Sequence, residues 1–117
     1  MKTAIIGSRN ITNVDLSRFI PAGTTEIVSG GARGVDTVAK EYANRNGLKL
    51  TEFLPDYERF GRGAPLKRNI TIIENADIVL AFWDGKSRGT KFVIDNCRRR
   101  NIPIKIYLAP DFVQMAE

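Results

Sequence analysis

The sequence alternates short apolar runs with amphipathic segments five times along its length. The clearest apolar run spans 77–83, and its Ile-Val-Leu-Ala-Phe core is apolar on both faces, as in a buried strand of a parallel sheet. The other expected strands are 3–7, 26–29, 48–54 and 104–108. Regular alternation of strand and helix predicts an α/β fold in which helices cover both faces of a mainly parallel five-stranded sheet. At 117 residues, we expect the chain to form a single domain.

The amphipathic segments are expected to form helices over about 14–20, 35–45, 65–76 and 90–100. Thr12 or Asn13 is the expected cap of the first helix, and Pro65 suits the first turn of the third. Between these helices, 55–63 reads as a loop rich in charged and aromatic residues. The tail after the last strand is expected to cover an edge of the sheet.

Three polar, glycine-containing loops, at 7–10, 29–36 and 84–90, each follow an expected strand. The second reads Ser-Gly-Gly-Ala-Arg-Gly-Val-Asp and precedes a helix, where free amides and the helix dipole favour an anion. It matches neither of the common nucleotide-binding glycine patterns. Because the carboxyl ends of parallel strands meet at one rim of the sheet, the three loops are expected to converge there on a phosphate or nucleotide site.

The candidate ligand-binding residues lie in these loops, at the end of the strand before the third loop, and at the start of the helix near 65. They are Gly7, Ser8, Arg9, Ser29, Gly30, Gly31, Arg33, Gly34, Asp36, Arg68, Asn69, Trp83, Asp84, Arg88, Gly89 and Thr90. The glycines allow close approach of the backbone to a ligand, and the arginines supply forked donors that suit phosphate. Each residue type also has a purely structural interpretation.

The glycines can serve as ordinary turn residues, and the serines and Thr90 as helix caps. Asp36 either complements a helix dipole or accepts from a ribose hydroxyl. Trp83 either stacks on a base or packs in the core. Arg68 and Asn69 either bind ligand or belong to a solvated helix face.

Histidine is absent, the only cysteine is Cys97, and the net charge is +5. Acid–base chemistry would therefore depend on carboxylates, tyrosine or lysine, and zinc sites built on histidine or several cysteines are excluded. We predict neither a metal nor a cofactor, and a packing role for Cys97. No apolar run is long enough to cross a membrane and the N-terminus has no signal-peptide pattern, so the expected location is cytoplasmic, with no membrane partner. The positive charge suits a nucleotide or a nucleic acid.

Three ordered stretches resemble the SLOG superfamily, the Rossmann-like group that contains the Smf/DprA proteins and the LOG phosphoribohydrolases. They are Val28–Asp36, Lys67-Arg68-Asn69 followed by Ala76-Asp77, and Ser87-Arg88-Gly89-Thr90. The chain is most similar to small stand-alone phage or bacterial domains of the YspA-like and DprA-like kind. This resemblance implies a Rossmann-like fold that binds a nucleotide or nucleotide-derived molecule, as a sensor or sequestering module. Apolar helix faces allow a homo-oligomer.

The resemblance also implies two alternatives. LOG enzymes cleave nucleoside 5′-monophosphates with a glutamate three residues after the final threonine, where this chain has Val93. A LOG-like phosphoribohydrolase would have to rely on Arg68, Asp84 or Asp95, so we leave enzymatic activity open. DprA proteins bind single-stranded DNA, and the net charge with the aromatic and basic segment 57–62 suits single-stranded nucleic acid. The same segment can instead act as a lid over a small nucleotide.

Overall fold

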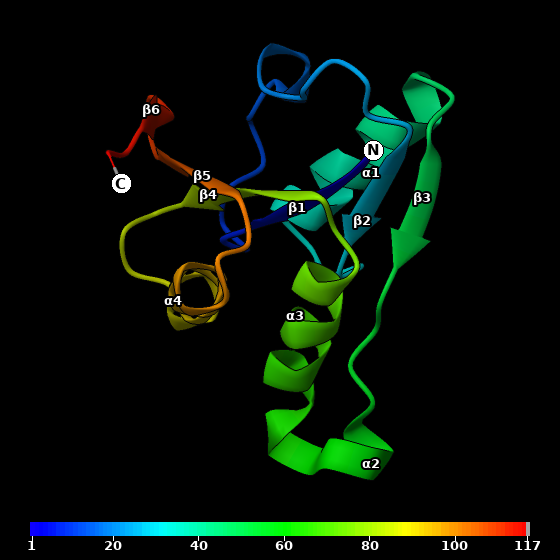
Figure 1. Cartoon of the computed structure of the whole chain (residues 1–117), viewed down its shortest axis with the longest axis vertical. Helices are drawn as coiled ribbons and strands as arrows, with labels where there is room; N and C mark the ends of the chain where they lie inside the picture. Colours follow the sequence, from blue (N-terminus) through cyan, green and yellow to red (C-terminus); the bar gives the residue numbers. More distant parts are fainter. Residues whose placement is uncertain (117) are drawn as a thin grey trace.

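The computed structural model describes residues 1–116 and contains a six-stranded sheet (Figure 1). Its strands are β1 (Lys2–Gly7), β2 (Glu26–Ser29), β3 (Lys49–Glu52), β4 (Ile78–Trp83), β5 (Ile104–Leu108) and β6 (Val113–Gln114). The strand order is β3-β2-β1-β4-β5-β6, and all neighbours pair in parallel except β5 and β6. The α/β class and the mainly parallel sheet are confirmed.

The expected number of five strands is wrong, because the tail adds β6. Tyr107 pairs with Gln114 and Leu108 with Val113, so the tail extends the sheet edge through hydrogen bonds. Two residues are too few to show the alternation of a strand in the sequence. Only the tertiary fold, which brings the tail back beside β5, creates this strand.

The helices are α1 (Val35–Arg45), α2 (Tyr57–Phe60), α3 (Ala64–Glu74) and α4 (Arg88–Arg100), with 3-10 turns η1 (Leu16–Arg18) and η2 (Gly61–Gly63). The expected helix over 14–20 is wrong, since only η1 forms there and Asp15 is its cap. Ile11, Val14 and Leu16 are buried at spacings of three and two, which suits an irregular segment lying on the sheet. The expected loop at 55–63 is also wrong, because it contains α2 and η2.

The helices form two layers around the sheet, which gives the Rossmann-like three-layer sandwich. Figure 1 shows α1 on one side and α3 with α4 on the other. Alternate residues of each central strand enter opposite cores: Ala4 and Ile6 pack with α3 and α4, whereas Ile5 packs with α1. Cys97 is fully buried in the first of these cores, and burial raises the pKa of its thiol to about 11. The packing role predicted for Cys97 is confirmed.

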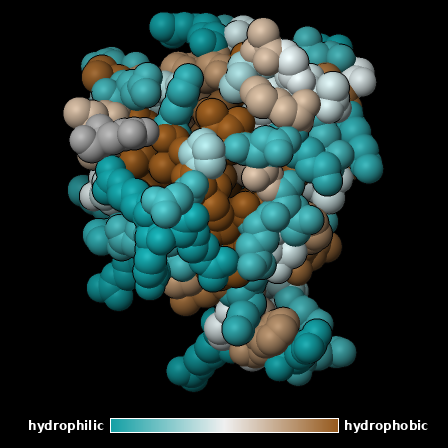
Figure 2. Space-filling model, viewed as in Figure 1, coloured by the Kyte–Doolittle hydropathy of each residue, from teal (hydrophilic) through white to brown (hydrophobic). Residues whose placement is uncertain are grey.

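An arm formed by α2, η2 and the beginning of α3 extends past the sheet. Figure 2 shows this arm as a narrow projection from the body of the molecule. Tyr57 and Phe60 are exposed on it, and the Arg59 and Lys67 cations lie 5.0 and 5.7 Å from the Phe60 ring centroid. None of the helices in residues 1–116 combines the length and apolarity needed to cross a membrane.

Candidate functional site

A cleft of about 400 Å³ lies beyond the carboxyl ends of β1, β2 and β4. The strand order reverses at this point of the sheet. From β1 the chain continues to β2 and β3 on one side, and it then returns to β4 and β5 on the other side of β1. Open parallel sheets bind ligands at such a switch point. The wall comprises Ile6, Gly7, Ser8, Arg9, Asn10, Gly30, Ala32, Arg33, Asp36, Pro65, Leu66, Arg68, Asn69, Ile72, Asp84, Ser87, Gly89, Thr90 and Val93. The three loops therefore do converge on one rim.

Eleven of the sixteen candidate ligand-binding residues line this cleft, and five do not: Ser29, Gly31, Gly34, Trp83 and Arg88. Ser29 is fully buried under its loop, and Gly31 and Arg88 are exposed away from the wall. Trp83 packs against the core, and its indole Nε1 donates to the Ser87 carbonyl at 3.1 Å. Of the two roles considered for Trp83, packing against the core is the one that this geometry supports.

Two of the glycines set how closely the loops approach one another. Gly34 has φ +78°, and a Cβ there would overlap the backbone of Arg9. A Cβ on Gly7 would lie 2.5 Å from the Phe82 carbonyl oxygen and 2.7 Å from Val35 Cγ2. Both positions require glycine for packing of β1 and its loop against neighbouring segments, whether or not a ligand binds.

Arg68 ties α3 to the glycine loop. Its Nη1 donates to the Gly30 carbonyl at 2.6 Å and to the Phe53 carbonyl at 3.4 Å, while Nε donates to Asn69 Oδ1 at 2.9 Å. Burial lowers the pKa of the guanidinium, and the nearby Asp36 carboxylate opposes this effect. A Cβ on Gly30 would lie 2.5 Å from Nη1, so the absence of a side chain at Gly30 leaves the room that the guanidinium occupies. Arg68 therefore positions the wall of the cleft.

The Asp36 side chain also holds the glycine loop, at Ala32. Its Oδ2 accepts from the Ala32 amide at 3.0 Å. Burial raises the pKa of this carboxyl, and the Ala32 amide, Arg68 and the neighbouring Ser29 hydroxyl oppose the rise. Within residues 1–116, the buried Ser29 Oγ makes no hydrogen bond of good geometry, and its hydroxyl lies beside the Asp36 carboxylate.

Hydroxyl groups link the first loop to the third at the beginning of α4. Ser8 Oγ lies 2.9 Å from Ser87 Oγ and accepts from the Asp84 amide at 3.1 Å. Ser87 Oγ in turn donates to Thr90 Oγ1 at 3.0 Å. Asp84 Oδ1 accepts from the Ser87 and Lys86 amides, both at 2.8 Å, and these bonds lower the pKa of Asp84. The carboxylate of Asp84 is thus turned into its own loop.

The first turn of α4 is left open toward the cleft. No side chain caps it, and it contains no acidic residue. The amides of Arg88, Gly89 and Thr90 consequently have no acceptor in the described part of the chain. A Cβ on Gly89 would meet nothing within 4 Å, so the space beside these donors is free. Such a helix start can bind an anion.

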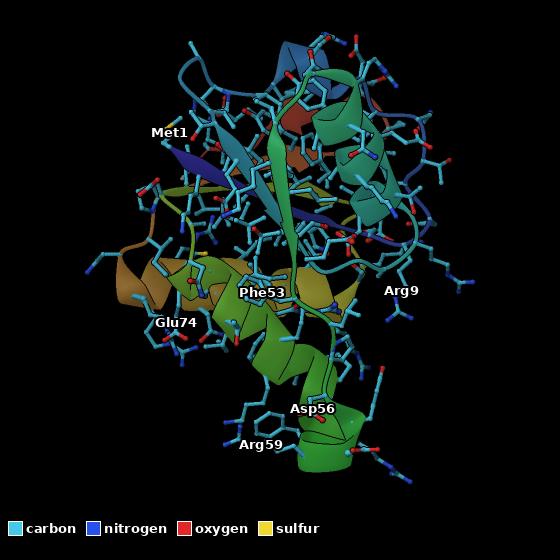
Figure 3. All side chains as sticks on the ribbon, turned by 90° about the vertical axis from the view of Figure 1, so that its right-hand side faces the viewer. Met1, Arg9, Phe53, Asp56, Arg59 and Glu74 are labelled. Atoms are coloured by element: carbon cyan, nitrogen blue, oxygen red, sulfur yellow. The ribbon has the colours of Figure 1, made fainter. Side chains whose placement is uncertain are left out.

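Arg9 and Arg33 supply cations at the same rim. Both are exposed, and neither forms an ion pair within residues 1–116. Figure 3 shows Arg9 at the edge of the molecule, remote from Arg59 at the tip of the arm. The charged residues of the wall are three arginines and two aspartates, an excess of one positive charge.

One side of the cleft is apolar, which the sequence did not predict. Ile6, Ile72 and Val93 are buried in it, while Pro65 and the exposed Leu66 continue it along α3. Figure 2 shows apolar side chains in the hollow between α3 and α4. Residues of this kind resemble ordinary core positions in a sequence. The only available signal was Pro65-Leu66 at the start of a helix directly beside Arg68.

The carboxylates near the LOG glutamate position offer little for a hydrolytic reaction, and the other cleft carboxylate, Asp36, lies at the start of α1. Val93, at the position of the LOG glutamate, is buried in the apolar wall. Asp95 is exposed outside the wall and pairs with Lys91 at 2.8 Å. Asp84 is held by its own loop amides. Across residues 1–116, no group of three or more acidic, cysteine or histidine side chains could hold a metal ion.

The fold and its cleft define a Rossmann-like α/β protein. Residues 2–60 match the family model of YAcAr, described as the YspA, cpYpsA-related SLOG family. The chain is also 36% identical over 84 residues to the Gene 61 protein of Mycobacterium phage D29, and the match covers 67% of each protein. This chain belongs to the YspA-related SLOG family. No solved structure matched it.

Proposed function

We propose that the cleft binds a nucleotide or nucleotide-derived small molecule, and that the protein acts as a sensor or sequestering module. The open first turn of α4 carries this proposal, because its free amides face the same cleft as Ser8 and the unpaired Arg9 and Arg33. A phosphate placed there would receive backbone and guanidinium donors together. The apolar side formed by Ile72, Val93 and its neighbours suits a base.

Isothermal titration calorimetry against mononucleotides, cyclic nucleotides and ADP-ribose tests the proposal. At least one of these ligands should bind, and Arg33→Ala should weaken its binding by about tenfold or more through loss of a charge-assisted hydrogen bond. Arg99→Ala is the matched control, since it removes the same charge from the exposed end of α4 far along the helix. Absence of binding by the whole panel, or equal losses in both variants, contradicts the proposal.

A LOG-like phosphoribohydrolase is the less favoured function, because Val93 and the commitments of Asp84 and Asp95 leave the cleft without a free carboxylate near α4. Incubation of concentrated protein with AMP and the other nucleoside 5′-monophosphates tests this alternative. Release of free base that disappears in Arg68→Ala, but persists in Arg99→Ala, would establish the enzyme. We expect no release.

Single-stranded nucleic acid is a second candidate partner, and the composition of the arm favours it. Tyr57 and Phe60 are exposed beside Arg59 and Lys67, a combination that can stack bases and neutralise phosphates. An oligonucleotide bound there should dissociate steeply as salt rises, and Phe60→Ala should weaken it. A flat salt response contradicts this candidate and leaves the arm available as a lid.

A further inference from the structure

The net charge of the protein is concentrated on one helix. The segment 86–100, which is α4 with the two residues before it, contains six of the eighteen basic residues and one of the thirteen acidic residues. Its formal charge is therefore +5, and the rest of the chain, with twelve residues of each sign, is neutral. All seven of these charged side chains are exposed. None of the six basic residues lines the cleft, so the proposed function does not account for them.

One outward side of α4 carries several of these cations. At about 100° per residue, Arg88, Arg98 and Arg99 lie within about 100° of arc around the helix axis, opposite the buried Val93 and Cys97. Figure 2 shows hydrophilic side chains gathered over α4. Together with the exposed lysine two residues before the helix, these arginines form no ion pair within residues 1–116. We call the four residues the basic face: Lys86, Arg88, Arg98 and Arg99.

The stability of the helix explains only half of the basic face. Arg98 and Arg99 lie in the last turn of α4, beside the negative end of the helix dipole, where cations stabilise a helix. Lys86 and Arg88 lie at the opposite end, where a cation beside the free amides is unfavourable. No acid in the first turn offsets this charge. A bound anion would offset it.

The cations of the basic face form two groups with a neutral stretch between them. Arg88 and Arg98 are ten residues apart, which corresponds to about 15 Å along α4. Between them Lys91 pairs with Asp95 at 2.8 Å, so the middle of the helix surface has no net charge. The major groove of a DNA duplex is about 12 Å wide, and a row of phosphates follows each side of it. Two groups of cations about 15 Å apart can therefore contact both rows while the neutral middle faces the groove.

Other polyanions match the basic face less well. A membrane-bound basic helix also inserts apolar side chains, and no large apolar side chain of residues 84–107 is exposed. A single DNA strand would bring phosphates to the neutral middle as well as to the two ends. Independently of the proposed function of the cleft, we propose that the basic face binds double-stranded DNA. It contacts phosphates on both sides of one major groove and does not read the base sequence.

Fluorescence anisotropy with a labelled DNA duplex of about two helical turns tests this proposal. The wild type should bind with a dissociation constant of about 1–100 μM near physiological salt. Four phosphate contacts predict that the logarithm of the association constant falls against the logarithm of the salt concentration with a slope of about −3 to −4. Lys86→Gln with Arg88→Gln, and separately Arg98→Gln with Arg99→Gln, should each weaken binding by about tenfold or more and make the slope shallower by about two.

Lys40→Gln with Arg45→Gln is the matched control. It removes two exposed cations from α1, on the other side of the sheet, and one of them also lies in a last helical turn (Figure 1). This variant should change neither the affinity for the duplex nor the slope. Losses equal to those of the two basic-face variants would overturn the proposal.

Measurements on the wild type keep the proposal refutable even if a variant fails to fold. Absence of duplex binding at low salt, or a slope shallower than about −2, overturns it. Equally tight binding of a single strand of the same length overturns the role of the groove. Equally tight binding of poly-L-glutamate assigns the face to an acidic protein instead. None of these outcomes bears on nucleotide binding in the cleft, which should be unchanged in Arg98→Gln with Arg99→Gln.

Discussion

Replacing Gly30 by alanine tests whether Arg68 holds the glycine loop in place. A Cβ at this position would lie 2.5 Å from Nη1 and 2.8 Å from Cζ of Arg68, so the guanidinium must withdraw. Withdrawal breaks its 2.6 Å hydrogen bond to the Gly30 carbonyl and its 3.4 Å contact with the Phe53 carbonyl. The backbone of Gly30 itself lies outside the left-handed region, so alanine causes no strain in φ.

The magnitude follows from the bond that is lost. A hydrogen bond from a charged donor contributes about 1.5–3 kcal/mol to the free energy of unfolding. Replacing glycine by alanine offsets part of this loss, because it restricts the unfolded chain and so stabilises the fold by about 0.4–1 kcal/mol. We therefore expect Gly30→Ala to lower the free energy of unfolding by about 1–2 kcal/mol. In an Arg68→Ala background no guanidinium remains to be displaced, and only the contact of the Cβ with Asp36 Oδ2 at 3.0 Å is left. The same substitution should then cost clearly less, about 0–1 kcal/mol.

Urea unfolding, followed by circular dichroism and by the fluorescence of the single tryptophan, gives the four free energies of this double-mutant cycle. Gly63→Ala is the matched control, because a Cβ there meets nothing within 4 Å and φ is not positive. It should be neutral or slightly stabilising in both backgrounds. An equal cost of Gly30→Ala with and without Arg68 would refute the tethering role of the guanidinium.

Three further predictions follow from single contacts. Gly34→Ala should cost about 3 kcal/mol or more, or prevent folding, because its Cβ overlaps the Arg9 backbone at a positive φ; Gly47→Ala, with positive φ but open space, should cost only about 1–2 kcal/mol in the same urea assay. At pH 8, Cys97 should react with a thiol reagent roughly a hundredfold more slowly in the native protein than in urea, since burial raises its pKa to about 11; rapid native labelling contradicts this. Two backbone amides lower the pKa of Asp84 below its ordinary value of 3.8. Ionised Asp84 therefore contributes fully to the free energy of unfolding above pH 3.8, and this contribution is lost as the pH falls through the lower pKa of the folded state. The gap in unfolding free energy between wild type and Asp84→Asn should therefore close only in that acid range, and a gap that persists at the lowest pH or closes near neutrality is inconsistent with the assigned contact.

Much of the fold was predictable because it depends on local pattern. The apolar run ending at Trp83 indicated a buried parallel strand, and the alternation of strands and helices limited the chain to a layered α/β architecture. The convergence of the three loops also followed, since parallel strands place their carboxyl ends at one rim. The secondary-structure predictions were wrong at η1, α2 and β6, because these elements are too short to show a periodic pattern of apolar residues.

The sequence by itself determined the fold class, the family resemblance and the loops that meet at the cleft, because each of these resides in residues close together along the chain. The tertiary structure alone decided what each loop residue does there. It brings Arg68 to a carbonyl 38 positions earlier, and it places the Ser8 hydroxyl 2.9 Å from that of Ser87, 79 positions later. It also sets Asp36 in the wall of the cleft, where its Oδ2 accepts from the Ala32 amide. Such roles depend on distances between segments that no spacing in the sequence encodes.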